Sequence, residues 1–194
     1  NLPPVAGAVL ENFPQEVEAA VSVCKYMAFG PLYNGSVRFK DYAVMADSLF
    51  FQTLGIEVLR GDPLHELQQK DVVFLSDRLA QKMFGDEDPV GKVINYDKQL
   101  QLTVKGIYAA LPENSTMNPE AVISIVSAWS RDWAEYSWEG GDSFFQYIRF
   151  RPGVKVDIEK FNARLETVIH NYLPQNGKDN SSYTSIVKPL RDVY

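Results

Sequence analysis

Asp71-Val-Val-Phe-Leu-Ser-Asp-Arg-Leu-Ala-Gln-Lys-Met-Phe-Gly-Asp-Glu-Asp-Pro-Val-Gly-Lys-Val-Ile94, followed after a polar turn by Leu102-Thr-Val-Lys-Gly-Ile-Tyr-Ala-Ala-Leu-Pro112, is the stretch that decides the fold. Its apolar run Val72–Leu75 is rich in β-branched residues and too short for a helix, so it predicts a buried strand. Ser76 can then cap a helix, and Gly85 can supply a left-handed C-terminal cap. Four apolar residues spaced along one face of this helix would be buried: Leu79, Ala80, Met83 and Phe84.

The residues after Gly85 predict a β-hairpin. Asp86–Pro89 has the composition of a turn, and a strand is expected to begin at Lys92. Asn95–Gln99 is a polar turn, and Leu100–Ala109 alternates apolar and polar residues as a half-buried return strand does. The unit is therefore a strand, a helix and a hairpin.

This arrangement resembles the periplasmic core domain of MacB/FtsX-type ABC transporter permeases. Such domains carry a similar strand, a helix ending in Phe-Gly (84–85), an Asp-Pro-x-Gly-Lys turn (88–92) and a Val-x-Gly-Val/Ile strand (104–107). The preceding residues 47–62 are similar to the family's lead-in, a short aromatic helix followed by a strand that ends in Gly-Asp. The resemblance covers roughly residues 42–112.

Composition sets the limits for the rest. A chain of 194 residues with 45% apolar side chains can bury a core and fits one domain or two small lobes. The 25 acidic and 19 basic residues give a net charge of −6, which disfavours a nucleic-acid groove or an anionic-lipid surface. The single cysteine, Cys24, excludes an internal disulfide and a CxxC site, and it is interpreted as a buried packing residue.

No membrane span and no signal peptide are predicted, because no apolar run approaches about 18 residues. The resemblance instead implies a domain that lies between two membrane helices outside this chain.

Outside the deciding stretch the sequence predicts further strands and helices. They are a strand over Ala6–Leu10, a helix over Phe13–Ala20, a strand at Val21–Lys25, a strand over Ser36–Met45, a short helix at Phe50–Leu54 capped by Asp47 and ended by Gly55, a strand over Ile56–Leu59, a surface connection over Leu64–Lys70, strands over Ala121–Val126 and Ser143–Arg151, a helix over Asp157–Tyr172 capped by Asp157, and a weak strand at Tyr183–Leu190.

Two groups of residues could carry a ligand. The acidic triplet Asp86-Glu87-Asp88 could hold a calcium ion, but it lacks the spacing and the bidentate Glu of an EF-hand, so the turn interpretation is preferred. The aromatic cluster of Trp129, Trp133, Tyr136 and Trp138 could stack on a sugar or peptide, while aromatic residues at helical spacing more often pack in a core. Whether Trp129, Trp133 and Trp138 form core or contact surface stays open.

No catalytic, cofactor-binding or metal-binding residue is nominated. The two histidines, His65 and His170, lie in a polar loop and on a helix surface, without the neighbours of a nucleophile or a metal site. A P-loop is also missing from the sequence. An enzyme is therefore the least favoured class.

Short strands mixed with a few helices predict an α+β fold. The resemblance implies two lobes, a porter-like subdomain of residues 1–62 plus 113–194 and an inserted strand-helix-hairpin subdomain of residues 63–112. The connection Pro112–Pro119 is a candidate hinge between them.

By the same resemblance, the chain would be the periplasmic domain of a bacterial inner-membrane permease. It would couple cytoplasmic ATP hydrolysis to a conformational change for export or lipoprotein-type transport. The implied partners are a cytoplasmic ATP-binding subunit or domain, a second permease copy, and a periplasmic adaptor or exported substrate; no cofactor and no nucleic acid are expected. The alternative is a ligand-binding or sensing domain of a bacterial cell-surface protein, which would place the tryptophan cluster in a pocket.

Overall fold

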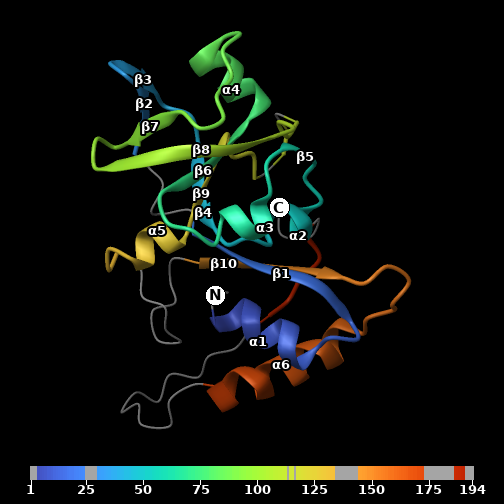
Figure 1. Ribbon diagram of the computed structural model, residues 1–194. Coiled ribbons are helices and arrows are strands. Elements are labelled where there is room, and N and C mark those ends of the chain that lie inside the picture. Colours follow the sequence, from blue (N-terminus) through green and yellow to red (C-terminus); the bar gives the residue numbers. More distant parts are fainter. Residues whose placement is uncertain are drawn as a thin grey trace.

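The computed structural model describes residues 4–24, 30–112, 114–115, 117–133, 144–172 and 186–190. The helices are α1 (Pro4–Asn12), α2 (Phe50–Leu54), α3 (Pro63–Glu66), α4 (Asp77–Phe84), α5 (Val126–Trp129) and α6 (Ile158–Tyr172) (Figure 1). The strands are β1 (Val17–Cys24), β2 (Leu32–Asn34), β3 (Val37–Phe39), β4 (Ala43–Ala46), β5 (Val58–Arg60), β6 (Val72–Ser76), β7 (Val93–Tyr96), β8 (Leu100–Tyr108), β9 (Ala121–Ser124) and β10 (Phe144–Phe150). Within the described ranges, none of the helices is long and apolar enough to cross a membrane.

The ten strands of the described residues join in one mixed sheet, and the predicted α+β class is confirmed. The strand order is β10-β1-β4-β9-β6-β8-β7-β2-β3, with β5 paired to β8. Strand β9 runs parallel to β4 and antiparallel to β6, and β6 runs parallel to β8. The sheet is therefore continuous from the N-terminal strand to the hairpin of the deciding stretch.

The described residues between 30 and 133, here called the central module, bury both faces of their middle strands. Along β6, Val73 and Leu75 face one core with α4 and α5, while Val72 and Phe74 face a second core with α2. Strands β4 and β9 divide their side chains between the same two cores. A strand covered on both faces has few polar positions, which explains the continuous apolar runs in the sequence.

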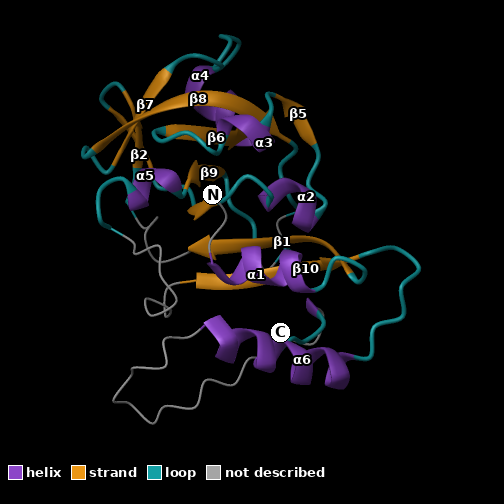
Figure 2. Ribbon diagram, turned by 60° about the horizontal axis from the view of Figure 1, so that its bottom comes forward, coloured by secondary structure: helices purple, strands orange, loops and turns teal. Residues whose placement is uncertain are grey.

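Residues 4–24 and 144–172, here called the end module, have a core of their own. Helices α1 and α6 lie side by side over one face of the β1–β10 ribbon (Figure 2). Phe161 of α6 is 1% exposed, and its ring centre lies 4.5 Å from that of Phe13 and 5.1 Å from that of Phe150. The other face of the ribbon packs on α2 of the central module.

The two modules meet at a seam between β1 and β4. Among the described residues, Val23–Ala46 and Cys24–Met45 are paired there, and seven residue pairs join β1 to β10. Side chains also close the seam, because Val21 and Val23 share a core with Phe50 and Phe51. The end module therefore contacts the central module through both backbone pairing and side chains.

The deciding stretch folds as predicted in its main features. Ser76 caps α4, since its Oγ accepts a hydrogen bond of 2.9 Å from the Leu79 amide. Leu79, Ala80 and Met83 are buried. Two details differ: Gly85 has a positive φ of 59° but a ψ of −126°, outside the left-handed helical region, and the polar turn narrows to Asp97–Gln99 because β7 continues to Tyr96.

The two N-terminal predictions were wrong. Residues Ala6–Leu10 belong to helix α1, not to a strand, because Ala6, Val9 and Phe13 lie on one helical face and pack against α6. The predicted helix over Phe13–Ala20 is a turn followed by β1. The strand predicted at Val21–Lys25 is confirmed over residues 21–24, while Lys25 lies outside the described residues, and β1 begins earlier, at Val17. The first half of β1 was missed because both of its faces are buried.

Several other boundaries need correction. The single strand expected over Ser36–Met45 is two strands, β3 and β4, at different places in the sheet. The strand predicted over Ile56–Leu59 begins at Val58, and that over Ala121–Val126 gives way to α5 at Val126. The expected surface connection at 64–70 contains helix α3, and Leu67 is only 1% exposed. The described part of the weak C-terminal strand, residues 186–190, is not a strand.

The division into residues 1–62 plus 113–194 and an inserted 63–112 stays a prediction. Strand β9, from the outer part, lies between β4 and β6, so the sheet and the cores run across this predicted boundary. Val73 and Leu75 share one core with Met45 and Ile123 across this boundary. A hinge at Pro112–Pro119 would have to open this shared core, which argues against that location.

Candidate functional site

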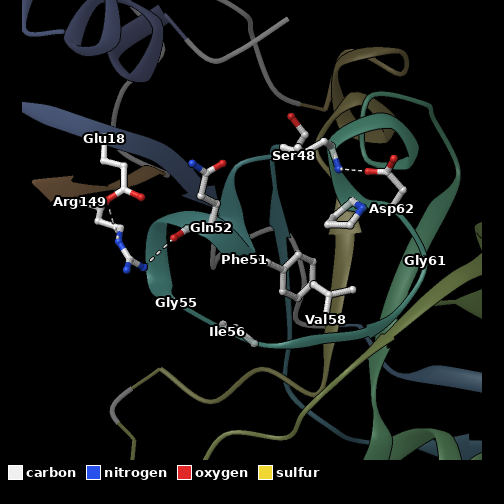
Figure 3. A pocket seen from close by; sticks show the side chains of 12 residues that line it. Glu18, Ser48, Phe51, Gln52, Gly55, Ile56, Val58, Gly61, Asp62 and Arg149 are labelled. Carbon is white, nitrogen blue, oxygen red and sulfur yellow. Dashed lines mark hydrogen bonds and ion pairs between the residues drawn. The ribbon is translucent and has the colours of Figure 1, made fainter. Parts of the chain in front are cut away.

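A groove of about 690 Å³ lies where the end module meets the central module (Figure 3). Glu18 of β1 and Arg149 of β10 line it from the end module. Phe51 of α2, Val58 of β5 and Asp62 before α3 line it from the central module. The groove therefore spans the seam on the face that carries α2.

Arg149 connects the two walls of this groove. Its Nε lies 3.3 Å from Glu18 Oε2, and its Nη1 donates a hydrogen bond of 3.0 Å to the carbonyl oxygen of Gln52 (Figure 3). Gln52 belongs to the last turn of α2, where helix carbonyls lack intrahelical partners. Gly55 ends that helix in the left-handed conformation, with φ of 69° and ψ of 31°. A cation from β10 thus binds the C-terminal end of α2.

Asp62, on the far wall, serves local structure. Its Oδ1 accepts a hydrogen bond of 3.1 Å from the Leu64 amide and caps α3, while its Oδ2 lies 2.6 Å from His65 Nδ1. The hydrogen bond from His65 lowers the pKa of Asp62. The groove therefore offers an apolar floor with an occupied ion pair and an occupied cap, a composition suited to contact between modules rather than to bond breaking.

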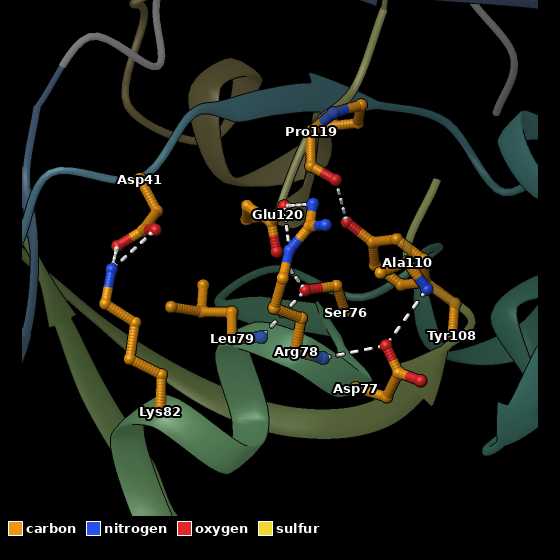
Figure 4. Close-up of polar contacts among 10 residues, drawn as sticks. All are labelled: Asp41, Ser76, Asp77, Arg78, Leu79, Lys82, Tyr108, Ala110, Pro119 and Glu120. Carbon is orange, nitrogen blue, oxygen red and sulfur yellow. Dashed lines mark hydrogen bonds and ion pairs between the residues drawn. The ribbon is translucent and has the colours of Figure 1, made fainter. Parts of the chain in front are cut away.

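A second polar cluster joins the start of α4 to the start of β9 (Figure 4). Glu120, 8% exposed, accepts hydrogen bonds from Ser76 Oγ and from the guanidinium of Arg78. Its backbone carbonyl accepts from the Ser76 amide, and its own amide donates to Tyr42. One residue therefore fixes the corner at which β6, α4 and β9 meet.

Two further contacts complete this corner (Figure 4). The hydroxyl of Tyr108 donates a hydrogen bond of 2.6 Å to the carbonyl oxygen of Pro119, and burial raises the pKa of Tyr108 well above its ordinary value. Asp77 Oδ1 accepts from the Ala110 amide at 3.0 Å. These hydrogen bonds link β6, α4, β8 and β9 into one polar network.

The motif residues of the deciding stretch also have structural partners. Asp88 forms two hydrogen bonds, of 2.8 and 3.0 Å, with the guanidinium of Arg60 on β5, which lower the pKa of Asp88. Glu87 pairs with Lys92. Gly106 is required by packing, because a Cβ there would lie 2.0 Å from the Phe74 ring. The motif thus builds the turn after α4 and ties it to β5.

Comparison with known proteins identifies the family. Residues 2–168 match the model of the MacB-like periplasmic core domain. The chain belongs to this family. Its MacB-like core domain is thus the extracytoplasmic domain of an ABC-type permease. No curated protein sequence matches the chain.

Three solved structures have a fold similar to that of the MacB-like core domain. A domain described as part of a permease from Porphyromonas gingivalis has a TM-score of 0.72 and 23% identity, over 90% of this chain and 72% of that one. The periplasmic region of MacB from Actinobacillus actinomycetemcomitans has a TM-score of 0.64 and 15% identity, over 88% and 75%. The extracellular domain of the noncanonic ABC-type transporter YknZ, from Gram-positive bacteria, has a TM-score of 0.60 and 13% identity, over 86% of this chain and 80% of that one.

The predicted ligand residues do not gather in the groove of the MacB-like domain. Trp129 and Trp133 pack partly buried against the core that holds α4, and the Arg131 guanidinium lies 5.8 Å from the Trp133 ring centre. Tyr136 and Trp138 lie outside the described residues. Among the described tryptophans the observed role is packing, and neither lines the groove.

The other candidates lie far apart in the MacB-like domain. His65 is exposed beside Asp62, and His170 Nδ1 lies 2.7 Å from the Glu166 carbonyl oxygen on α6. Cys24 is fully buried in β1. In the described ranges no group of three or more His, Cys, Asp or Glu side chains is arranged to hold a metal ion. The acidic triplet at 86–88 therefore does not form such a group. Glu120 and Arg149 were not predicted from the sequence, because their partners Ser76 and Gln52 are 44 and 97 residues away in the chain.

Proposed function

We propose that this domain transmits movement within an inner-membrane permease. It would couple ATP hydrolysis on a cytoplasmic ATP-binding subunit or domain to a periplasmic conformational change, for export or lipoprotein-type transport. A second permease copy and a periplasmic adaptor or exported substrate are the further partners of this proposal. The proposed role is mechanical.

The observation that carries this proposal is the construction of the end module. Its outer helices, α1 and α6, pack on each other and share the core around Phe161, so a force applied to either would move both. The end module contacts the central module at the β1–β4 seam, through side chains packed on α2, and along the groove beside them. A compact unit with a core of its own can move as a rigid body relative to the unit that it contacts.

The proposal predicts that ATP changes the distance between the two modules. The test uses the intact permease with its ATP-binding partner in lipid nanodiscs, with spin labels at the exposed positions Ala163 of α6 and Gln101 of β8. Electron paramagnetic resonance should give different label distances without nucleotide and with ATP. A matched pair within the central module, at Gln81 and Gln101, should keep one distance. Equal distances for the first pair in both states would contradict the proposal.

The alternative, a ligand-binding or sensing domain, has less support. It expects the tryptophan cluster to line a pocket, and the described members of that cluster pack against a core instead. The groove itself is walled by groups that already have partners. We therefore retain the transmission role as the proposed function.

A further inference from the structure

Asp47 occupies the seam between the modules, directly after β4. The antiparallel register that pairs Val23 with Ala46 places Asp47 opposite Ser22. Its Oδ2 accepts a hydrogen bond of 3.1 Å from the Ser22 amide of β1, and its Oδ1 accepts one of 2.9 Å from the Leu49 amide before α2. One carboxylate thus extends the β1–β4 ladder by a side-chain hydrogen bond and ties it to α2.

This carboxylate is buried without a cationic side chain as a partner among the described residues. Asp47 is 2% exposed. The charged groups on the surrounding ribbon, Glu18 of β1 and Arg149 of β10, pair with each other, and Phe50–Leu54 of α2 carries no charge. Burial raises the pKa of Asp47 to about 6, although the hydrogen bonds from the Leu49 and Ser22 amides lower it.

We propose that Asp47 is a proton-operated latch between the two modules. Uptake of a proton strengthens the contact of β1 with the corner between β4 and α2, and loss of the proton weakens it. The physical reason is that the seam shields an uncompensated negative charge from water, a cost that protonation removes. The inference goes beyond the transmission role and does not rest on it, because it concerns an equilibrium of this chain alone.

The sign follows from the two states of the seam. In the closed seam the pKa of Asp47 is about 6, and in an opened seam the hydrated carboxyl returns to its ordinary value of 3.8. The closed state therefore binds the proton more tightly and gains population as the pH falls through the higher value. Between pH 7 and pH 5 the ratio of closed to open seam should rise by about tenfold.

Native-state hydrogen exchange of the Ser22 amide measures this ratio directly, because that amide donates to Asp47. After correction for intrinsic exchange, its protection factor in the 194-residue chain should be about tenfold higher at pH 5 than at pH 7. The Thr103 amide, which donates to the Asp71 carbonyl oxygen inside the central module, is the internal reference. Its protection factor should be about the same at pH 5 and at pH 7.

The variant Asp47→Asn removes the titrating group and should bring the Ser22 ratio close to one. The matched control Asp62→Asn makes the same chemical change at an exposed helix cap and should leave the tenfold ratio intact. A ratio that persists in Asp47→Asn overturns the latch. If Asp47→Asn does not fold, the carboxyl carbon of Asp47 in the unmodified chain decides by its NMR titration: a midpoint near pH 6 supports the latch, and a midpoint below pH 5 overturns it.

Discussion

The end module and the central module obtain their cores in different ways. In the central module, β4, β6 and β9 are covered on both faces, so each strand is held by two cores and two neighbouring strands. In the end module, a two-stranded ribbon has helices α1 and α6 on one face and borrows α2 from the central module for the other. The end module, which has a core of its own, is therefore the more separable part, and the β1–β4 seam is its boundary with the central module.

The largest expected effects come from truncating one buried ring in each module. Phe74→Ala and Phe161→Ala should each cost about 3–5 kcal/mol of unfolding free energy, because both rings are almost fully buried. The consequence should differ by module. Phe74 packs against Phe51 and β8, so its loss should lower hydrogen-exchange protection throughout the sheet, whereas Phe161→Ala should lower protection first in α1, α6, β1 and β10.

Urea denaturation and hydrogen exchange on the two variants check this prediction. The separation of the two modules is contradicted if Phe161→Ala lowers hydrogen-exchange protection in the central strands β6 and β8 as much as in the end module. The whole chain would then be one cooperative unit.

A smaller effect is expected at the corner of the central module. Ser76→Ala removes the cap of α4 and one of the donors to Glu120, which should cost about 1–2 kcal/mol. Ser130→Ala is the matched control, because that exposed hydroxyl donates to the Ser127 carbonyl oxygen and accepts from Arg131, away from the corner. Thermal unfolding should show the loss for Ser76→Ala alone. A similar decrease of the melting temperature in both variants would contradict a special role of the corner.

The parts of this fold that the sequence predicts are those where local and tertiary signals agree. Val72–Leu75, the cap at Ser76 and the glycine at 85 lie within 14 residues, so neighbouring residues decide strand, helix and turn together. The N-terminal elements were mistaken because their signal is tertiary. Ala6 and Val9 are small apolar residues whose helical face packs against α6, and the first half of β1, before the predicted strand at Val21, lacks alternation because both of its faces are buried.

The candidate site was less predictable than the fold. Asp47 was expected to cap α2, and its side chain does accept a hydrogen bond just before that helix, but Leu49 occupies the N-cap position. Its second partner, Ser22, lies 25 residues away. In the sequence, Arg149 is an ordinary polar residue of the strand predicted over Ser143–Arg151. Only the fold reveals that it binds Gln52 of another module, since pairs distant in the chain leave no spacing pattern.

The smallest expected effect concerns Arg149 beside the β1–β4 seam. Arg149 is 41% exposed, and exposed ion pairs contribute little, so Arg149→Gln should change the unfolding free energy by at most about 1 kcal/mol. Arg164→Gln, which removes the exposed pair with Glu16 inside the end module, should do the same. The two variants should differ in one respect, because only Arg149 reaches across to α2. Arg149→Gln should lower the protection of the Ser22 amide roughly two- to fivefold at fixed pH, within the same 1 kcal/mol, and Arg164→Gln should leave it unchanged. Equal protection in both variants would mean that the groove contributes nothing to closing the seam, and the buried contacts of β1 with α2 and the Asp47 side chain would then hold it alone.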